Sequence, residues 1–341
     1  MNKKIVKDGS SKIATNPQHF KKWLEKEDIG PLVIEVGVTY GCNHNCVHCS
    51  FQQFDSYTGV NFINKDAFIQ FLDEFKLMGG IEVYFAGNGE PLLHPHICEF
   101  FEYGKKIGLD MTLSTNGEYL TDEIANRILQ ATKWVNFSIN GGNLQDYITI
   151  HKCSEESFYK VIKNIKNVMK VKQESNLDIK VVMQYIAYSL NKNGIDDIVK
   201  LYHELGVDQL NIRSAGFRSE YNTFEDKKIL DKLNELNNIE GIIVRWDSNM
   251  AVAPWDKCYG INFRINMDYQ GNIYPCSKNY YENCTIGSIE KKSFKEIWLS
   301  EKKKQVFFSV ENTKDTTKCR TWCQCRGDNI YIDNYLKEQI I

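Results

Sequence analysis

Three cysteines, Cys42, Cys46 and Cys49, follow an apolar segment with the spacing C-x3-C-x2-C. Three thiolates this close together can hold a metal centre and leave one coordination position open, as catalysis requires. A structural zinc site needs a fourth protein ligand, and only His44 and His48 inside the same short loop are near in sequence. An iron–sulfur cluster fits the ligand number better, because three cysteines hold three irons and leave the fourth iron free.

A second group of cysteines lies near the carboxyl terminus. The chain has eleven cysteines, and six of them follow residue 257: Cys258, Cys276, Cys284, Cys319, Cys323 and Cys325. The basic amino-terminal segment has no apolar core behind it and is not a signal peptide. Because disulfides are rare in a reducing cytosol, we expect a second metal site rather than disulfide bonds. Cys98 and Cys153 stand alone, and we expect a small buried hydrophobe and an unreactive loop thiol, respectively.

Composition excludes several classes of function. The 341 residues are enough for one large and one small domain; 42% are hydrophobic, 25% are charged and the net charge is -2. No basic run suggests a nucleic-acid or membrane surface, and no apolar run approaches the length of a membrane span. We therefore expect a cytoplasmic protein without nucleic-acid or membrane partners.

Six strand-like segments alternate with helical patterns between residues 32 and 213. The strands are expected at residues 32–38, 81–87, 110–115, 134–139, 179–186 and 207–213. This order predicts an α/β fold with a parallel sheet and right-handed crossovers. Six units are too few for a closed eight-unit barrel, so we expect a partial (β/α)6 TIM-like barrel, with ligands at the carboxyl ends of its strands.

Helical patterns fill the intervals and the two ends of the chain. We expect helices near residues 19–26, 67–75, 124–129, 158–169, 225–236 and 294–307, and a further strand at 242–246. Asn64 and Thr121 are the expected N-caps of the second and third. The expected division is an amino-terminal extension (1–30), a catalytic core (31–250) and a small cysteine-rich α+β iron–sulfur module (251–341).

The thiol segment resembles the signature of the radical S-adenosylmethionine (SAM) family, Cys-x3-Cys-x-aromatic-Cys. His48 occupies the aromatic position, where tyrosine or phenylalanine is more usual. The resemblance implies a [4Fe-4S] cluster whose open iron is chelated by SAM. It also implies that an electron from the cluster cleaves SAM to a 5'-deoxyadenosyl radical, which abstracts a substrate hydrogen, while the protein positions the cofactors.

Loops at other strand ends agree with this resemblance. FAGNGEP (85–91) is similar to the family's Gly-Gly-Glu-Pro segment near the methionine amino group, although Asn88 interrupts it. Glycines admit a ligand close to the backbone, and a carboxylate pairs with an ammonium group. The SAM-contacting residues that the resemblance implies are His48, Gly87, Gly89, Glu90, Ser114, Asn116, Ser138 and Arg213.

The carboxyl-terminal cysteines resemble the auxiliary-cluster module of radical SAM enzymes, in its long form (SPASM) or short form (twitch). GNIYPC (271–276) and the segment 287–298 carry the likeness. Six cysteines suggest one auxiliary [4Fe-4S] cluster. Cys258 and Cys276 match the module best, and Cys319, Cys323 and Cys325 compete for two positions. Because Cys323 and Cys325 are one residue apart, Cys319 with either of them is the easier pair. Cys284 is expected to be a free thiol.

Several functions remain open. The main expectation is oxidation or another modification of a sugar, aminocyclitol or similar small molecule, because few residues precede the first strand to form a peptide-binding domain. The alternative is a maturase of a ribosomally made peptide or protein. A non-catalytic iron–sulfur electron carrier or zinc-binding scaffold is the alternative of another class. A radical SAM enzyme also needs an electron donor, such as flavodoxin or ferredoxin.

Overall fold

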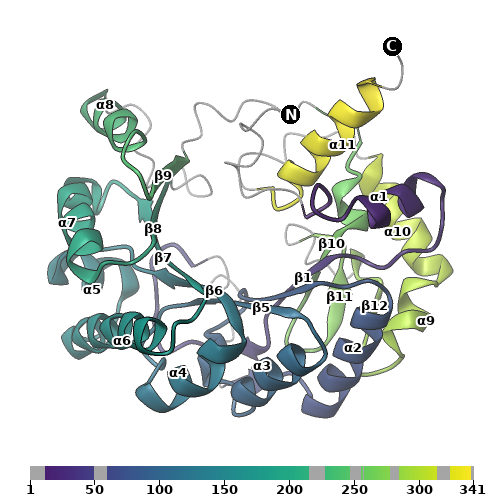
Figure 1. Ribbon diagram of the computed structural model, residues 1–341, viewed down its shortest axis with the longest axis horizontal. Coiled ribbons are helices and arrows are strands. Elements are labelled where there is room, and N and C mark those ends of the chain that lie inside the picture. The colour runs from purple at the N-terminus through teal and green to yellow at the C-terminus, as the bar shows by residue number, and fades with distance from the viewer. Residues whose placement is uncertain are drawn as a thin grey trace.

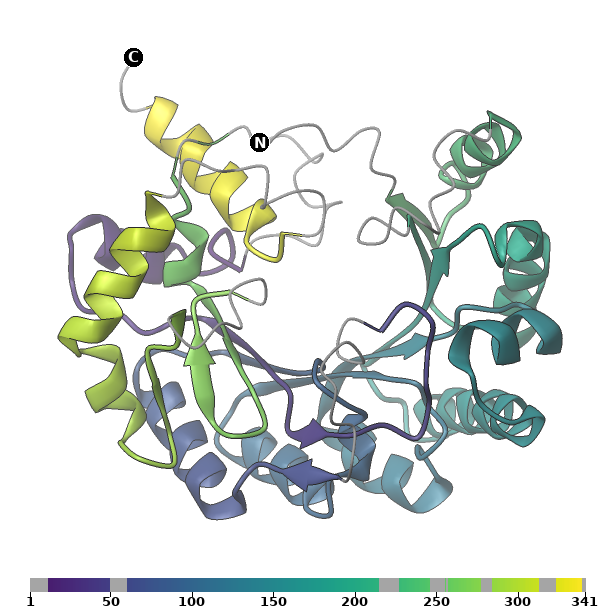
Figure 2. The ribbon, with the colours of Figure 1, turned by 180° about the vertical axis from the view of Figure 1, so that it is seen from behind.

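The strands form one large sheet that curves into an open barrel. The computed structural model describes residues 12–49, 60–214, 227–245, 255, 257–276, 284–312 and 323–338. In the described residues the ten-stranded sheet has the order β12-β11-β10-β1-β4-β5-β6-β7-β8-β9. Figures 1 and 2 show the sheet bent around a central space, with helices α2, α3, α4, α6 and α7 along its outer side.

The middle of the sheet is entirely parallel, as the alternating pattern predicts. Its strands are β10 (Arg264–Met267), β1 (Val33–Val36), β4 (Glu82–Phe85), β5 (Asp110–Thr115), β6 (Thr132–Ser138), β7 (Lys180–Ala187), β8 (Gln209–Ser214) and β9 (Ile242–Arg245). All six strands expected between residues 32 and 213 are present. The partial TIM-like barrel is confirmed, and β10 beside β1 and β9 beside β8 extend it by one parallel strand at each end.

Helices cross between these strands and cover the outer face. They are α2 (Lys65–Leu77), α3 (Ile97–Lys106), α4 (Asp122–Ile128), α5 (Leu144–His151), α6 (Glu155–Glu174), α7 (Ile195–Leu205) and α8 (Lys227–Leu236). The side chain of Asn64 accepts from the backbone of Ala67 at 3.0 Å, and Thr121 accepts from Ile124 at 3.4 Å, so both expected N-caps are confirmed. Among the described helices, none is long and apolar enough to cross a bilayer.

The carboxyl-terminal region joins the same sheet. β10 pairs in parallel with β1, and β11 (Asn272–Tyr274) and β12 (Gly287–Ser288) continue as an antiparallel edge. The remaining elements are α1 (Pro17–Leu24), the small hairpin of β2 (Thr39–Tyr40) and β3 (Asn61–Phe62), α9 (Phe294–Trp298), α10 (Glu301–Glu311) and α11 (Arg326–Glu338). The single helix expected over 294–307 is wrong, because the Ser300 side chain accepts from Lys303 and starts a second helix.

The two faces of the sheet differ in chemistry. Val36 and Phe85 are fully buried in the apolar core that also contains side chains of the outer helices. The alternate positions face the concave side, where Glu35 pairs with Tyr84 and Ser114 is beside Asn136 on the next strand. Because side chains alternate along a strand, the barrel presents polar groups inward and apolar groups outward.

Candidate functional site

The three cysteines of the first group lie together in the loop after β2. Cys42, Cys46 and Cys49 are all half-buried. Burial, followed by the nearby charges of Glu90 and Cys49, raises the pKa of Cys42 to about 12. Burial and the two neighbouring thiols raise the pKa of Cys46 well above its usual value. Thiols that oppose one another's ionisation fit a metal centre, because bound cations deprotonate and neutralise them.

A close backbone contact joins this loop to the loop after β4. Gly41 and Gly89 form a bridge, and the backbone of Glu90 donates to the carbonyl of Gly41 at 3.0 Å. A Cβ atom on Gly89 would clash with the Gly41 carbonyl oxygen and lie 2.7 Å from that of Thr39. The Gly-x-Gly-Glu pattern therefore has a packing reason here, since only glycine permits this approach.

Glu90 is turned towards the loop after β5. Its buried carboxylate accepts from Thr115 Oγ1 at 2.6 Å and from the backbone nitrogens of Asn116 and Leu92 at 2.8 and 3.1 Å. Burial raises the pKa of Glu90 to about 7, against the effect of these three donors. The carboxylate thus fastens two strand-end loops together, and its contact with SAM stays a prediction.

Two donors reach the sulfur atom of Cys42. The Asn116 side chain donates to Cys42 Sγ at 3.7 Å and to Asn43 Oδ1 at 2.9 Å. The backbone nitrogen of His44 donates to the same sulfur at 3.4 Å. Such donors stabilise a thiolate ligand and orient it, so Asn116 lies beside the expected cluster ligand.

A buried histidine pair, which the sequence did not reveal, adjoins Cys46. His151 Nδ1 lies 3.4 Å from Cys46 Sγ and 3.3 Å from His44 Nδ1. His44 Nε2 lies 2.9 Å from a carboxylate oxygen of Glu118, and the backbone nitrogen of Asn140 donates to His151 Nε2 at 3.2 Å. Burial lowers the pKa of both histidines, most strongly that of His151. His151 is 105 residues from Cys46, so no local motif links them.

The other residues expected to contact SAM surround this region. His48 stacks on Tyr188, with ring centroids 5.2 Å apart and planes at 21°. Gly87 has a φ of +98°, which favours glycine. Ser138 ends β6 and is half-buried, and Arg213 lies in β8. The positions at the carboxyl ends of β4, β5 and β6 agree with the expected ligand edge of the sheet, whereas the contacts themselves stay predictions.

Glu35 is the centre of a polar group on the concave face. Burial raises its pKa to about 7, although the charges of Arg264 and Arg213 and a hydrogen bond from Gln324 act in the opposite direction. Gln324 Nε2 donates to Glu35 Oε2, and Asn266 Nδ2 donates to Gln324 Oε1 at 3.0 Å. Glu35 still keeps part of its surface accessible. A carboxyl group in this setting can exchange a proton near neutral pH.

Tyr84 and its neighbours extend this polar group along the sheet. Burial and the charge of Glu35 raise the pKa of Tyr84 to about 12, against the effect of a hydrogen bond with Ser114. Asn136 donates to Ser114 Oγ at 3.0 Å, and the Tyr84 ring lies 4.9 Å from that of Trp134. Ser114, expected near SAM, thus belongs to a hydrogen-bonded chain on the concave face.

Three cysteines of the second group converge. The thiol of Cys325 hydrogen-bonds with Cys258 and Cys323, which lowers the pKa of Cys258 and raises that of Cys325. The Asn329 side chain donates to Cys258 Sγ at 3.3 Å and accepts from the backbone of Gly260 at 2.7 Å. A turn before α11 brings the sulfurs of Cys323 and Cys325 into one group with Cys258. Whether both bind one cluster stays a prediction.

The remaining cysteines differ in position. Cys276 comes two residues after β11, which runs antiparallel to β10. Cys284 comes three residues before β12, which pairs with β11. Cys319 lies outside the described residues. Cys98 is buried in the apolar core, as expected, and burial raises the pKa of Cys153 to about 11, which agrees with an unreactive thiol.

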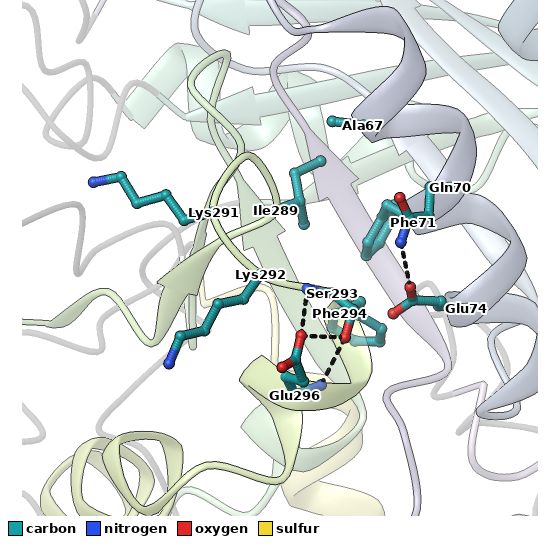
Figure 3. Close-up of a pocket in the computed structure, with 10 residues that line it drawn as sticks. All are labelled: Ala67, Gln70, Phe71, Glu74, Ile289, Lys291, Lys292, Ser293, Phe294 and Glu296. Atoms are coloured by element: carbon teal, nitrogen blue, oxygen red, sulfur yellow. Dashed lines mark hydrogen bonds between the residues drawn. The ribbon is translucent and has the colours of Figure 1, made fainter.

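A separate cavity of about 340 Å³ lies between α2 and the start of α9 (Figure 3). Its polar groups largely serve the helices themselves: Gln70 donates to Glu74 at 3.0 Å, and Ser293 and Glu296 form a capping box. Glu74 also accepts from the backbone of Lys295 at 2.9 Å. None of the expected site residues lines this cavity, so we assign it to helix packing.

Two stretches of the chain match known protein families. Residues 36–183 match the radical SAM superfamily, and residues 258–326 match the iron-sulfur cluster-binding domain SPASM. The chain belongs to the radical SAM superfamily. Its cofactors are therefore a [4Fe-4S] cluster and SAM, with further iron–sulfur content in the SPASM region. In both matched regions, cysteines that lie close together can supply the thiolate ligands of iron–sulfur clusters.

Curated relatives of this radical SAM chain match it over different lengths. An AdoMet-dependent heme synthase of Methanosarcina barkeri is 24% identical over 301 residues, which are 79% of this chain and 82% of that protein. The mycofactocin maturase MftC of Mycobacterium tuberculosis is 30% identical over 125 residues, which are 36% of this chain and 29% of that protein.

Solved structures share the fold. SuiB of Streptococcus suis bound to S-adenosylmethionine has a TM-score of 0.62 at 15% identity, covering 85% of this chain and 70% of that chain. AnSMEcpe with bound AdoMet has a TM-score of 0.62 at 17% identity, covering 82% of this chain and 84% of that chain. These structures show the fold alone, and the family matches show a radical SAM enzyme with a SPASM domain.

Proposed function

We propose that this radical SAM enzyme oxidises a small polar molecule, such as a sugar or an aminocyclitol, with an auxiliary cluster assisting. The observation that carries the proposal is the polar concave face, where Glu35 is hydrogen-bonded to the residue between Cys323 and Cys325. Side chains that form hydrogen bonds and exchange protons thus lie next to the carboxyl-terminal cysteines. They suit a substrate with hydroxyl or amino groups.

We assign the ligands of the SAM-binding cluster to Cys42, Cys46 and Cys49. The raised pKa values of Cys42 and Cys46 and the donors around Cys42 support this assignment. Bound there, the cluster and SAM supply the radical that removes a hydrogen atom from the substrate. Glu90 holds the adjoining loops in place through its three hydrogen bonds.

Glu35 is our candidate for the proton acceptor. A two-electron oxidation at a substrate carbon removes one hydrogen atom, one proton and one electron. With a pKa of about 7, the Glu35 carboxyl is partly ionised at neutral pH and can receive that proton. The positive charges of Arg264 and Arg213 favour the ionised form of the same carboxyl.

For the auxiliary cluster we propose Cys258, Cys323 and Cys325, with a fourth ligand from Cys276 or Cys319. The hydrogen bonds among the first three thiols support the choice. We retain the division into residues 1–30, 31–250 and 251–341 as a proposal, although β10 of the last segment completes the sheet beside β1.

Peptide maturation is the second candidate function. SuiB bound to its precursor peptide SuiA matches the fold with a TM-score of 0.63 at 15% identity, and the mycofactocin maturase matches part of the sequence. Either reaction requires a reductant, and a flavodoxin or ferredoxin is the expected electron donor. Incubation with candidate precursor peptides and with aminocyclitols, followed by mass spectrometry, separates the two substrates.

The proposed cofactor chemistry is tested by anaerobic reconstitution with iron and sulfide. Two [4Fe-4S] clusters require about eight irons per chain. With SAM and a strong reductant, the wild-type chain should form 5'-deoxyadenosine, whereas Cys46→Ala should not. Cys98→Ala is the matched control, because this thiol lies in the apolar core. One zinc without sulfide, or equal product from Cys46→Ala, would refute the proposal.

A further inference from the structure

We propose that His151 donates a hydrogen bond from Nδ1 to Cys46 Sγ and thereby makes the SAM-binding cluster easier to reduce. This inference rests on the proposed function, since it takes Cys46 as a cluster ligand. His151 Nδ1 lies 3.4 Å from Cys46 Sγ. The residue acts through Cys46 and is therefore a positioning residue.

The direction of this hydrogen bond follows from the other side of the ring. The backbone N–H of Asn140 donates to His151 Nε2 at 3.2 Å, so Nε2 carries a lone pair and no hydrogen. In a neutral imidazole the hydrogen must then lie on Nδ1. His151 consequently presents a donor, not an acceptor, to the sulfur of Cys46.

His44 shares the same donor. His44 Nε2 lies 2.9 Å from Glu118 and can only donate to that carboxylate, which leaves a lone pair on His44 Nδ1. That atom is 3.3 Å from His151 Nδ1. The His151 hydrogen is therefore shared between the His44 nitrogen and the Cys46 sulfur, and Glu118 fixes the second acceptor.

The ring is held rigidly in this position. His151 is buried at the end of α5 and stacks on Tyr147, with centroids 4.2 Å apart and planes at 20°. A donor held against a ligand sulfur stabilises the reduced cluster more than the oxidised cluster, because reduction adds negative charge to the sulfurs. The hydrogen bond therefore raises the reduction potential.

Two substitutions at this position separate the donor from the packing. His151→Phe keeps a ring for stacking but removes both nitrogen atoms. His151→Asn places an amide nitrogen as many bonds from the backbone as Nδ1, so it retains a donor towards Cys46. Both variants remove the acceptor of the Asn140 N–H. The effect of that loss is therefore the same in both and does not contribute to the difference between their potentials.

The first measurement is the midpoint potential of the SAM-binding cluster, followed by electron paramagnetic resonance in reconstituted enzyme. His151→Phe should raise the ratio of oxidised to reduced cluster about tenfold at fixed potential. For a one-electron couple this corresponds to a midpoint potential about 59 mV lower. His151→Asn should recover most of this shift. Tyr147→Phe is the control, because its buried hydroxyl has no hydrogen-bond partner among the described residues. Equal shifts in the Phe and Asn variants, or none in Phe, would overturn the inference.

A second measurement does not depend on the cluster. Nitrogen-15 NMR of the imidazole rings in the full chain without iron should show His151 protonated at Nδ1 and unprotonated at Nε2. The opposite tautomer overturns the inference even if the cluster assembles normally. If the wild-type chain binds no cluster at Cys46, the proposed function is refuted. The role of His151 in cluster reduction is then refuted as well, even if the NMR spectrum shows the expected tautomer.

Discussion

Replacement of Glu35 by glutamine should change the pH dependence of stability in a defined direction. The folded pKa is about 7 and the ordinary value is 4.5. Because the pKa is raised in the folded chain, the protonated form of Glu35 favours folding. Its contribution to stability is fully present below about pH 4.5 and is lost as pH rises through about 7, where folding must keep an ionised carboxyl buried. The cost of keeping this carboxyl in the folded chain reaches about 3 kcal/mol at pH 8 and is below about 1 kcal/mol at pH 5.

Glu35→Gln removes that cost, since the amide does not ionise. The free energy of unfolding of the variant, relative to wild type, should therefore rise by about 2 kcal/mol between pH 5 and pH 8. Difference infrared spectroscopy gives the pKa directly, as the pH at which the protonated-carboxyl band of wild type is half lost. The exposed Glu301→Gln serves as the control.

Activity provides an independent assay of the same substitution. Glu35→Gln should form 5'-deoxyadenosine with SAM and reductant but release little oxidised substrate, because the proton acceptor is missing. A band that titrates near pH 4.5, together with parallel stability curves, would refute the electrostatic reasoning. Full turnover by the variant would refute the assigned proton acceptor.

Three further predictions concern the loops and the second thiol group. Gly89→Ala should lower the free energy of unfolding by about 2–3 kcal/mol and reduce iron binding, because its Cβ clashes with backbone atoms; thermal unfolding and iron analysis check this. Asn329→Ala should reduce auxiliary-cluster iron to about half or less, since Cys258 loses its donor; iron analysis and electron paramagnetic resonance distinguish the two clusters. Thr115→Val should destabilise the chain by about 1–2 kcal/mol at pH 8 and less at pH 5, because the lost hydrogen bond favours ionised Glu90; unfolding at both pH values measures it.

Matched variants give each of these predictions a control. Gly206→Ala adds a Cβ at a glycine with a φ of +63°, but nothing lies within 4 Å of that atom, so it should cost about 1 kcal/mol without iron loss. Asn312→Ala removes an exposed helix-end amide and should retain both clusters. Thr115→Ser keeps the hydroxyl and should restore the pH dependence; iron loss in all variants alike would contradict the reasoning.

The sequence predicted the features whose signals are local. Asn64 and Thr121 were recognisable caps, and alternating apolar segments predicted the parallel strands, because each signal lies within a few residues of its effect. The thiol spacing predicted the first metal site for the same reason. The helix expected over 294–307 is wrong because apolar residues continue past the break, where Ser300 caps the start of a second helix.

Other features depend on contacts between distant segments. β10 is four residues long, and its place beside β1 comes from pairing between Val33 and Arg264, which no local pattern records. The contact of His151 with Cys46 likewise joins separate loops. The sequence gives no sign of a role for Gln324, because its hydrogen bond goes to Glu35 on β1, far away along the chain.

The pairing of β1 with β10 has a consequence for synthesis and folding. β1 is made early, but the strand that covers one of its edges is made only when the ribosome has reached residue 267. Until then the edge of β1 displays unpaired backbone groups, which are a template for association with other chains. Long-range pairing is also slow, since a large loop must close first. Chains that stop before β10 should therefore aggregate, and chaperones should be needed most during this interval.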